Sequence, residues 1–149
     1  METSHNSLTT TVLYTADNPG SCLFYGQTAA NPSMWQTVNL TDFADSSLID
    51  TGTVKFNLSA WLGGYVAQND MAEVSVTFYD QSSQTVGSVA SIGPVTNVDR
   101  GSVTSFLFRK TTGFVSVGAR SATVLVLITR ALGSINDGYV DSINFFLYQ

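Results

Sequence analysis

The segment VKFNLSAWL, residues 54–62, changes the character of its side chain at almost every step. Apolar Val54, Phe56, Leu58, Ala60 and Leu62 alternate with Lys55, Asn57, Ser59 and Trp61. Successive side chains of a β-strand point to opposite faces, so a period of two predicts a strand with one buried face. The segment AEVSVTFY, residues 72–79, repeats the pattern and predicts a second strand of the same kind.

The rest of the chain follows the same pattern. Short runs rich in β-branched and aromatic residues predict further strands at 11–14, 22–25, 35–40, 86–92, 103–110, 122–129 and 139–148. Turn-forming residues separate them, at 80–84, 93–94, 99–101, 111–113 and 136–138. One short helix is expected within 41–50, with Thr41 as its cap. Strand 122–129 is apolar on both faces, so we expect neighbouring strands or another element to cover it.

These elements predict an all-β protein. We expect one antiparallel β-sandwich domain over residues 1–149, in which residues 1–10 form a flexible tail.

The composition limits the possible partners. Charged residues make up 11% of the chain, less than half of the usual share, and the net charge is −5. The 6 Lys and Arg residues are scattered, so nucleic acid is not an expected partner. No apolar run approaches the ~20 residues of a membrane-spanning helix. A neutral, hydroxyl-rich surface suits a secreted or cell-surface protein, and we expect an extracellular location.

Cysteine and histidine are too scarce for several kinds of chemistry. The chain has one of each, Cys22 and His5, and His5 lies in the expected tail. An internal disulfide, a Ser-His-Asp triad and a histidine-based zinc site are therefore excluded.

Strand order predicts which loops share one end of the sandwich. Neighbouring antiparallel strands alternate in direction, so counting strands brings together four loops that are distant in sequence. These loops carry Asn31, Asn69-Asp70, Asp99-Arg100 and Asn136-Asp137.

Four segments resemble a known family. They are FNLSAWLGGYVAQNDMAEVSVTFYD (56–80), GPVTNVDRGSVTSFL (93–107), VGARSATVLVLITR (117–130) and NDGYVDSINFFL (136–147). In the order and spacing of their residues, these segments resemble secreted carbohydrate-binding-module-like domains with the galactose-binding-domain-like jelly-roll fold. The resemblance runs from about Trp35 to the C-terminus.

The resemblance also implies a calcium site. In such jelly rolls an Asp near the start of the last strand often helps to bind a structural calcium ion, together with groups from the N-terminal strand. Asp141 is the Asp near the start of the last strand here, and Asp17 or Asn18 is the candidate partner. Asp141 shares its strand phase with Ile143 and Phe145, so we expect it on the core side. The alternative is that Asp141 accepts backbone N–H groups or pairs with an arginine.

The loop cluster allows two interpretations. Its carboxylates can brace the loops by accepting N–H groups, with Asp99-Arg100 supplying an ion pair. Alternatively, the same side chains bind the hydroxyl groups of a sugar. The candidate residues of the cluster are Asn69, Asp70, Asp99, Arg100, Asn136 and Asp137.

Trp61 favours the sugar interpretation. It lies on the polar phase of its strand, and Tyr65 follows in the next loop, so both rings could stack on the apolar face of a pyranose. The alternative is that a loop covers Trp61. Tyr139, Tyr25 and Trp35 are further aromatic candidates.

Three classes of function remain. We favour a non-catalytic, lectin-like module that binds a glycan or glycoprotein through loops at one end, with or without calcium. The alternative is a structural or adhesive extracellular subunit that assembles into a homo-oligomer. Glycoside hydrolysis by Asp70 and Asp137 ranks third, because short loops offer little cleft, and we do not expect an enzyme.

Overall fold

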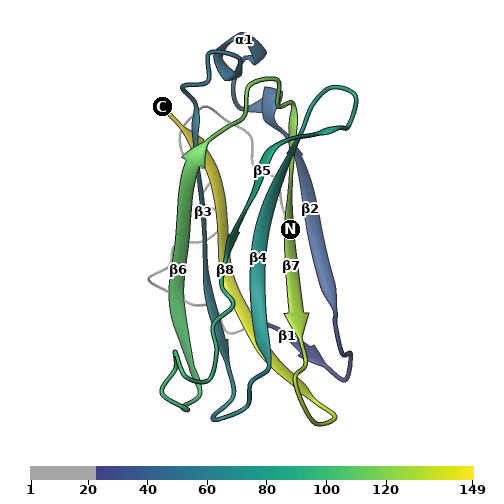
Figure 1. Ribbon diagram of the computed structural model, residues 1–149, viewed down its shortest axis with the longest axis vertical. Helices are drawn as coiled ribbons and strands as arrows, with labels where there is room; N and C mark the ends of the chain where they lie inside the picture. The colour runs from purple at the N-terminus through teal and green to yellow at the C-terminus, as the bar shows by residue number, and fades with distance from the viewer. Residues whose placement is uncertain (1–22) are drawn as a thin grey trace.

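The computed structural model describes residues 23–149 and consists of two four-stranded antiparallel sheets packed face to face (Figure 1). The first sheet has the order β1 (Phe24–Gln27), β8 (Asn136–Tyr148), β3 (Lys55–Gly64) and β6 (Ser105–Phe114). The second has the order β2 (Ser33–Asn39), β7 (Ser121–Thr129), β4 (Met71–Tyr79) and β5 (Thr85–Ile92). Two sheets of four strands in this order form a jelly-roll sandwich, which confirms the predicted all-β class.

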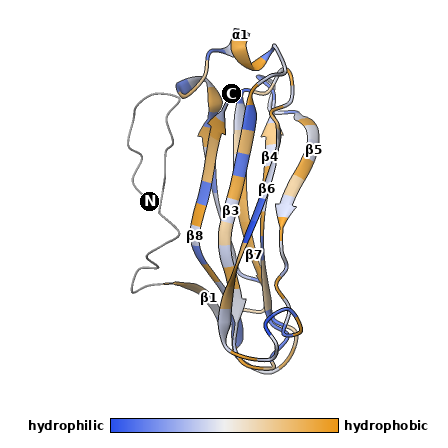
Figure 2. Ribbon diagram, turned by 90° about the vertical axis from the view of Figure 1, so that its left-hand side faces the viewer, coloured by the Kyte–Doolittle hydropathy of each residue, from blue (hydrophilic) through white to orange (hydrophobic). Residues whose placement is uncertain are grey.

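The alternating strands build the core between the sheets. Phe56, Leu58 and Leu62 of β3 are buried, as are Val74 and Phe78 of β4. Aromatic rings of the two sheets meet there, because the ring centroids of Phe56 and Phe78 lie 5.3 Å apart. Figure 2 shows the corresponding alternation of hydrophilic and hydrophobic residues along β8.

Strand β7 lies between β2 and β4, so the strand that is apolar on both faces is inside a sheet, as expected. Its neighbours supply hydrogen bonds on both sides, and its inner residues Val126 and Ile128 are buried in the core.

Two expected turns are instead parts of strands. Thr111-Thr112-Gly113 belongs to β6 and Asn136-Asp137-Gly138 opens β8. Both glycines provide clearance for packing rather than a turn. A Cβ on Gly113 would lie 2.9 Å from Phe56 Cε1, and one on Gly138 would lie 2.6 Å from Ile128 Cγ2.

The helical segment is shorter than expected, and Thr41 does not cap it. A 3₁₀ turn, η1 (Leu40–Asp42), is capped by Asn39, whose side chain accepts the backbone N–H of Thr41 at 3.4 Å. The helix α1 (Ser46–Ile49) begins after Asp45. Across residues 23–149, none of the helices has the length and apolar character that crossing a membrane requires.

The predicted tail at 1–10, the predicted strand 11–14, Asp17, Asn18 and Cys22 lie outside the described residues.

Candidate functional site

The loops that strand order placed at one end do meet. The carboxylate of Asp70 joins two of them, because its Oδ1 accepts the N–H of Ala131 at 2.6 Å and its Oδ2 accepts the N–H of Asp137 at 2.9 Å. Asp70 is only 1% exposed. The two Asn-Asp pairs, 67 residues apart, are therefore neighbours in space.

Arg100 joins its own loop to the loop that carries Asn69-Asp70, from inside the protein. Its guanidinium donates to the carbonyl oxygens of Gly64, Val66 and Val103 at 2.9, 2.9 and 2.6 Å, and to that of Gln68 at 2.8 Å. The side chain is 4% exposed, and burial lowers the pKa of the guanidinium from its usual value. The observed partners of Arg100 are backbone carbonyl oxygens, so the expected ion pair with Asp99 is not what holds the loops.

Asp99 instead makes a local turn. Its carboxylate accepts the backbone N–H and the hydroxyl of Thr96 at 2.8 and 2.7 Å, and the backbone hydrogen bond is the main cause that lowers the pKa of Asp99. Its cationic neighbour is Arg109 of β6, at 3.9 Å.

Asn136 ties the loop before β2 to the start of β8. Its Nδ2 donates to the carbonyl oxygens of Ala29 and Ala30, both at 3.1 Å. Gly26 makes room for this amide, since a Cβ there would overlap Asn136. This contact brings the loop that carries Asn31 to the same end.

A small polar group lies beside these contacts. The amide of Gln68, with its nitrogen toward the carboxylates, donates to Asp137 Oδ2 at 3.0 Å and to Asp70 Oδ2 at 3.2 Å. The hydroxyl of Tyr139 lies 3.5 Å from Asp137 Oδ1. Burial, followed by the charge of Asp137, raises the pKa of Tyr139.

The loop end therefore contains the bracing network that was one of the two interpretations. Asp70, Arg100 and Asn136 are buried within it, whereas Tyr65, Asn69 and Asp99 are exposed. Ligand binding by any of these residues remains a prediction.

Asp141 does not face the core, which corrects the expectation drawn from its strand phase. Between Ser59 and Trp61 of β3 there is one residue, but between their partners Asn144 and Asp141 there are two. This β-bulge contains Ser142, with a φ of 51°, and it reverses the facing of every residue before it. Asp141 consequently shares the outer face with Trp61, while Ile143 and Phe145 pack on the core.

The described residues offer Asp141 little support as a metal ligand. Its Oδ1 accepts the N–H of Ser142 at 2.7 Å. Within residues 23–149, no group of three or more His, Cys, Asp or Glu side chains gathers to hold a metal ion. Calcium prefers six or more oxygen ligands, so this part of the chain does not fit a calcium site by itself. The proposed partner Asp17 lies outside it.

The outer face of the first sheet carries a large set of aromatic side chains. Cross-strand register aligns residues from three strands in rows, because directly paired residues point to the same face. One row is Phe108–Trp61–Asp141 and the next is Phe106–Gly63–Tyr139. Tyr25 of β1 extends the second row.

Neighbouring rings of these two rows are in contact. The ring centroids of Trp61 and Phe108 lie 5.6 Å apart, and those of Phe106 and Tyr139 lie 5.8 Å apart. Gly63 gives Phe106 the space to lean inward, because a Cβ on Gly63 would lie 3.1 Å from Phe106 Cδ1. Tyr25 meets Tyr139 edge to face at 6.5 Å.

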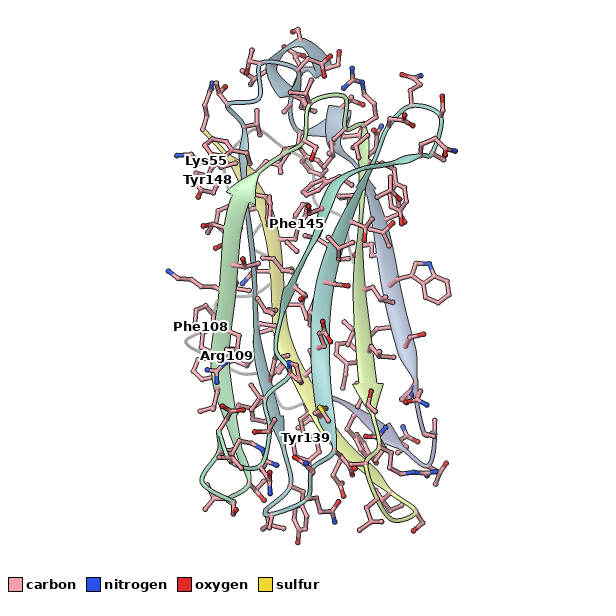
Figure 3. The ribbon with its side chains drawn as sticks, viewed as in Figure 1. Lys55, Phe108, Arg109, Tyr139, Phe145 and Tyr148 are labelled. Atoms are coloured by element: carbon pink, nitrogen blue, oxygen red, sulfur yellow. The ribbon has the colours of Figure 1, made fainter. Side chains whose placement is uncertain are left out.

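Polar rows separate this aromatic group from a second one. The middle rows are Lys110–Ser59–Asn144 and Thr112–Asn57–Phe146, and the far row is Phe114–Lys55–Tyr148. The Nζ of Lys55 lies 5.5 Å from the ring centroid of Phe114 and 6.0 Å from that of Tyr148. Figure 3 shows Lys55, Tyr148 and Phe108 on the outer side of the sheet and Phe145 between the sheets. We call this whole surface the aromatic face.

Sequence reasoning found Trp61, Tyr139 and Asp141 but not the surface that they share. The residues it missed are Lys55, Phe106, Phe108, Phe114, Phe146 and Tyr148. The alternation in β6 could have suggested an aromatic stripe, since Phe106, Phe108 and Phe114 share one phase. Pairing β6 with β3 and β3 with β8 required the register of the fold.

Comparison with known proteins yields structural matches alone. No family model and no curated protein matches the sequence. The enzymatically active domain of bacteriophage CBA120 tailspike protein 4 has a TM-score of 0.57 at 18% identity, over 89% of this chain and 17% of that chain. A family 16 carbohydrate-binding module has a TM-score of 0.54 at 14% identity, over 87% of this chain and 78% of that chain.

The structure of infectious bursal disease virus, Gx strain, is also similar, with a TM-score of 0.53 at 11% identity, over 87% of this chain and 30% of that chain. The chain thus spans less than a third of the tailspike and viral chains but most of the carbohydrate-binding module. At these identities the similarity establishes a shared β-sandwich fold.

Proposed function

We propose that this protein is a non-catalytic carbohydrate-binding module that holds a glycan on its aromatic face. The observation that carries the proposal is the pair of adjacent rows around Trp61, which hold two contacting pairs of rings and, opposite Trp61, the carboxylate of Asp141. A pyranose ring has an apolar face that stacks on aromatic rings, and its hydroxyl groups bond to carboxylates and amides. Asn57, Ser59 and Asn144 supply further polar groups in the next rows.

The similar structures support this proposal at the level of the fold. One of them is itself a carbohydrate-binding module, and this chain covers 78% of it. The proposed partner is a glycan or glycoprotein, and the proposed location is extracellular or at the cell surface, where such ligands are abundant.

The loop end has a supporting role in this proposal. The network of Asp70, Arg100 and Asn136 fixes the loops that border the row of Tyr139, and the exposed Tyr65 and Asn69 extend the contact surface. The proposal thus moves the main contacts from the loops, where the sequence suggested them, to the face of the sheet.

The chemistry of Asp70 supports a binding role over catalysis. A glycosidase needs two carboxyl groups that both reach the scissile bond. Asp70 is buried, and its two oxygens accept backbone N–H groups of two other segments. The oxygens of Asp70 are therefore already used to hold two segments of the fold together. This favours a binding role, even though one of the similar structures is an enzymatically active domain.

The proposal is tested by Trp61→Ala. A glycan array first identifies ligands, and titration calorimetry then compares the wild type with the variant. We expect at least a ten-fold loss of affinity, about 1.4 kcal/mol, from the loss of the stacking surface. Val89→Ala is the matched control, because Val89 is an exposed apolar residue on the second sheet. An array without hits, both with and without calcium, would overturn the proposal.

Calcium dependence is a separate part of the proposal, and chelation tests it. If Asp141 and Asp17 hold a calcium ion, EDTA lowers both the glycan affinity and the melting temperature, and added calcium restores them. Asp141→Asn then removes the response to calcium. A melting temperature that EDTA leaves unchanged would remove calcium from the proposal and leave glycan binding standing.

A structural or adhesive subunit is the second candidate. The exposed Leu125 and Leu127 on the outer face of β7 favour it, because exposed apolar surface is common at protein interfaces. Light scattering coupled to size exclusion separates the two candidates: assembly requires a mass that increases with concentration, whereas the binding module elutes as a monomer.

A further inference from the structure

The second sheet presents a strongly exposed indole to the opposite side of the molecule. Trp35 of β2 is 69% exposed. Its chain neighbours on the inner phase, Met34 and Val38, pack against the core, so Trp35 points outward. Strand β2 is also the outermost described strand of its sheet, which leaves the indole accessible from the edge.

Hydroxyl groups surround this indole in the cross-strand register. Trp35 pairs with Leu125, which pairs with Ser75. The adjacent row is Thr37–Thr123–Thr77, in which the hydroxyl oxygens of Thr37 and Thr123 lie 2.7 Å apart. Paired residues lie about 5 Å apart and successive rows about 7 Å apart, so the hydroxyls of Thr37 and Thr123 lie within reach of a sugar ring stacked on Trp35. Ser75, about 10 Å away across Leu125, is placed to meet a second ring.

The charge of this sheet selects a neutral ligand. Among all residues of β2, β7, β4 and β5, the only one with a charged side chain is Glu73. Glu73 pairs with Leu127 on the same outer face, so this surface offers no cation to a phosphate or a polyanion and only one carboxylate to a basic peptide, whereas hydroxyl groups and an indole match a neutral sugar.

The apolar area is small for a protein partner. Trp35, Leu125 and Leu127 are 69%, 37% and 38% exposed. At about 200 Å² for each side chain they offer roughly 300 Å², whereas a stable protein interface buries about 800 Å² on each partner, of which roughly 450 Å² is apolar. The patch is too small for a stable dimer but is adequate for one or two sugar rings.

We propose that Trp35 is the centre of a second glycan-binding site, which takes a neutral pyranose. The indole stacks on the apolar face of the sugar, and the hydroxyls of Thr37 and Thr123 exchange hydrogen bonds with its edge. The inference rests on the proposed function for its class of ligand. Because the two sites lie on opposite outer faces, the module becomes bivalent and can link two glycan chains.

Native affinity gels that contain glucomannan, galactomannan, xyloglucan or xylan test this inference. Trp61→Ala isolates the second site, and we expect this variant still to be retarded in at least one gel. Adding Trp35→Ala abolishes that retardation, and Trp35→Phe in the same background preserves part of it. In calorimetry with a hexasaccharide of the retarding glycan, the stoichiometry decreases from two per chain in the wild type to one in Trp35→Ala.

The outcomes distinguish the two proposals. If Trp35→Ala keeps the wild-type stoichiometry and retardation, the second site is overturned and the aromatic face stands. If no gel retards the wild type, the second site is overturned, and the proposal for the aromatic face is decided by the glycan array. If light scattering shows that Trp35→Ala converts a dimer into a monomer, the patch is an interface between copies and the second site is overturned. Equal melting temperatures of the wild type and Trp35→Ala verify that the fold is intact.

Discussion

At the scale of single residues, Arg100 shows how a side chain can organise a loop end from within. Burying a charge is costly unless hydrogen bonds compensate. Arg100 meets this condition with four carbonyl oxygens, which belong to loop segments on both sides of β4 and β5. Sequence inspection identified the residue but expected a carboxylate partner. Carbonyl groups occur at every position, so a sequence does not reveal which of them converge.

Arg100→Ala should therefore be strongly destabilising. The substitution leaves four carbonyl oxygens without their donor, and we expect the free energy of unfolding to decrease by about 3 kcal/mol. Arg100→Lys should recover only part of this loss, because an ammonium group has three donors and lacks the planar, forked arrangement of the guanidinium N–H groups. Urea denaturation measures the effect. Lys110→Ala, at an exposed position of β6, is the control and should change stability by less than about 0.5 kcal/mol.

At the scale of the element, the bulge in β8 decides which residues the strand presents to the aromatic face. Before the bulge, Tyr139 and Asp141 face outward, and after it Asn144, Phe146 and Tyr148 do so. A strictly regular strand would turn Asp141 toward the core. The sequence has no glycine at the bulge, and the residue with left-handed backbone angles there is Ser142. Strict alternation of inward and outward residues therefore did not predict the bulge.

Ser142→Gly should stabilise the protein. Ser142 has a φ of 51°, a conformation that glycine adopts more readily than residues with a Cβ. We expect a gain of about 1 kcal/mol in thermal unfolding, with glycan binding unchanged. Deletion of Ser142 should leave Asp141 on the outer face, because Asn144, Ile143 and Asp141 would then pair in regular register with Ser59, Ala60 and Trp61. A deletion variant that no longer folds, or that loses glycan binding, would contradict this account of the strand.

The helix α1 is held by an ion pair at its C-terminal end. Asp50 Oδ2 lies 2.7 Å from Arg120 Nη2, and Asp50 Oδ1 accepts the N–H of Gly118 at 2.9 Å. The hydrogen bond from Arg120 is the main cause that lowers the pKa of Asp50 below its usual 3.8. A lowered pKa in the folded state means that the contact contributes stability above the unfolded-state pKa and loses it as the pH falls through the folded value.

Asp50→Asn should accordingly lower stability at neutral pH and change it little in strong acid. The difference between the urea midpoints of wild type and variant should be constant above about pH 5 and should shrink as the pH falls below the usual Asp pKa. Asp45→Asn is the comparison, since the Asp45 side chain makes no capping hydrogen bond. A difference that persists unchanged at pH 2 would show that the Asp50 charge is not its source.

At the scale of the whole molecule, strands from opposite ends of the described chain lie side by side. Strand β1 pairs with β8, and the register aligns Phe24 with Val140. Strand β8 also pairs with β3, so the first sheet cannot form until the end of the chain is in place. Pairing strands that are distant in sequence costs loop-closure entropy before the new contacts compensate for it.

Folding should therefore be slow. All-β domains with many non-local contacts fold in milliseconds to seconds, and we expect this chain to behave likewise after dilution from urea. Stopped-flow tryptophan fluorescence gives the rate, with Trp61 as a reporter in the first sheet. Complete folding within about 100 microseconds would contradict the expectation.

The sequence alone determined most of the strands of residues 23–149 and the end at which their loops meet. Both follow from local rules: alternation assigns a residue to a face, and the count of strands assigns a loop to an end. Those rules placed Asp70 beside Asp137 correctly. They were wrong where glycine served packing, as at Gly113 and Gly138, because a packing partner such as Phe56 is distant in sequence.

Only the tertiary structure decided which surface the candidate site occupies. The row Phe108–Trp61–Asp141 is assembled from three strands, and its members are adjacent because of cross-strand register. The bulge at Ser142 further reverses the facing of Asp141. Register and bulges depend on contacts between residues tens of positions apart, and for that reason no local pattern in the sequence shows the aromatic face as a whole.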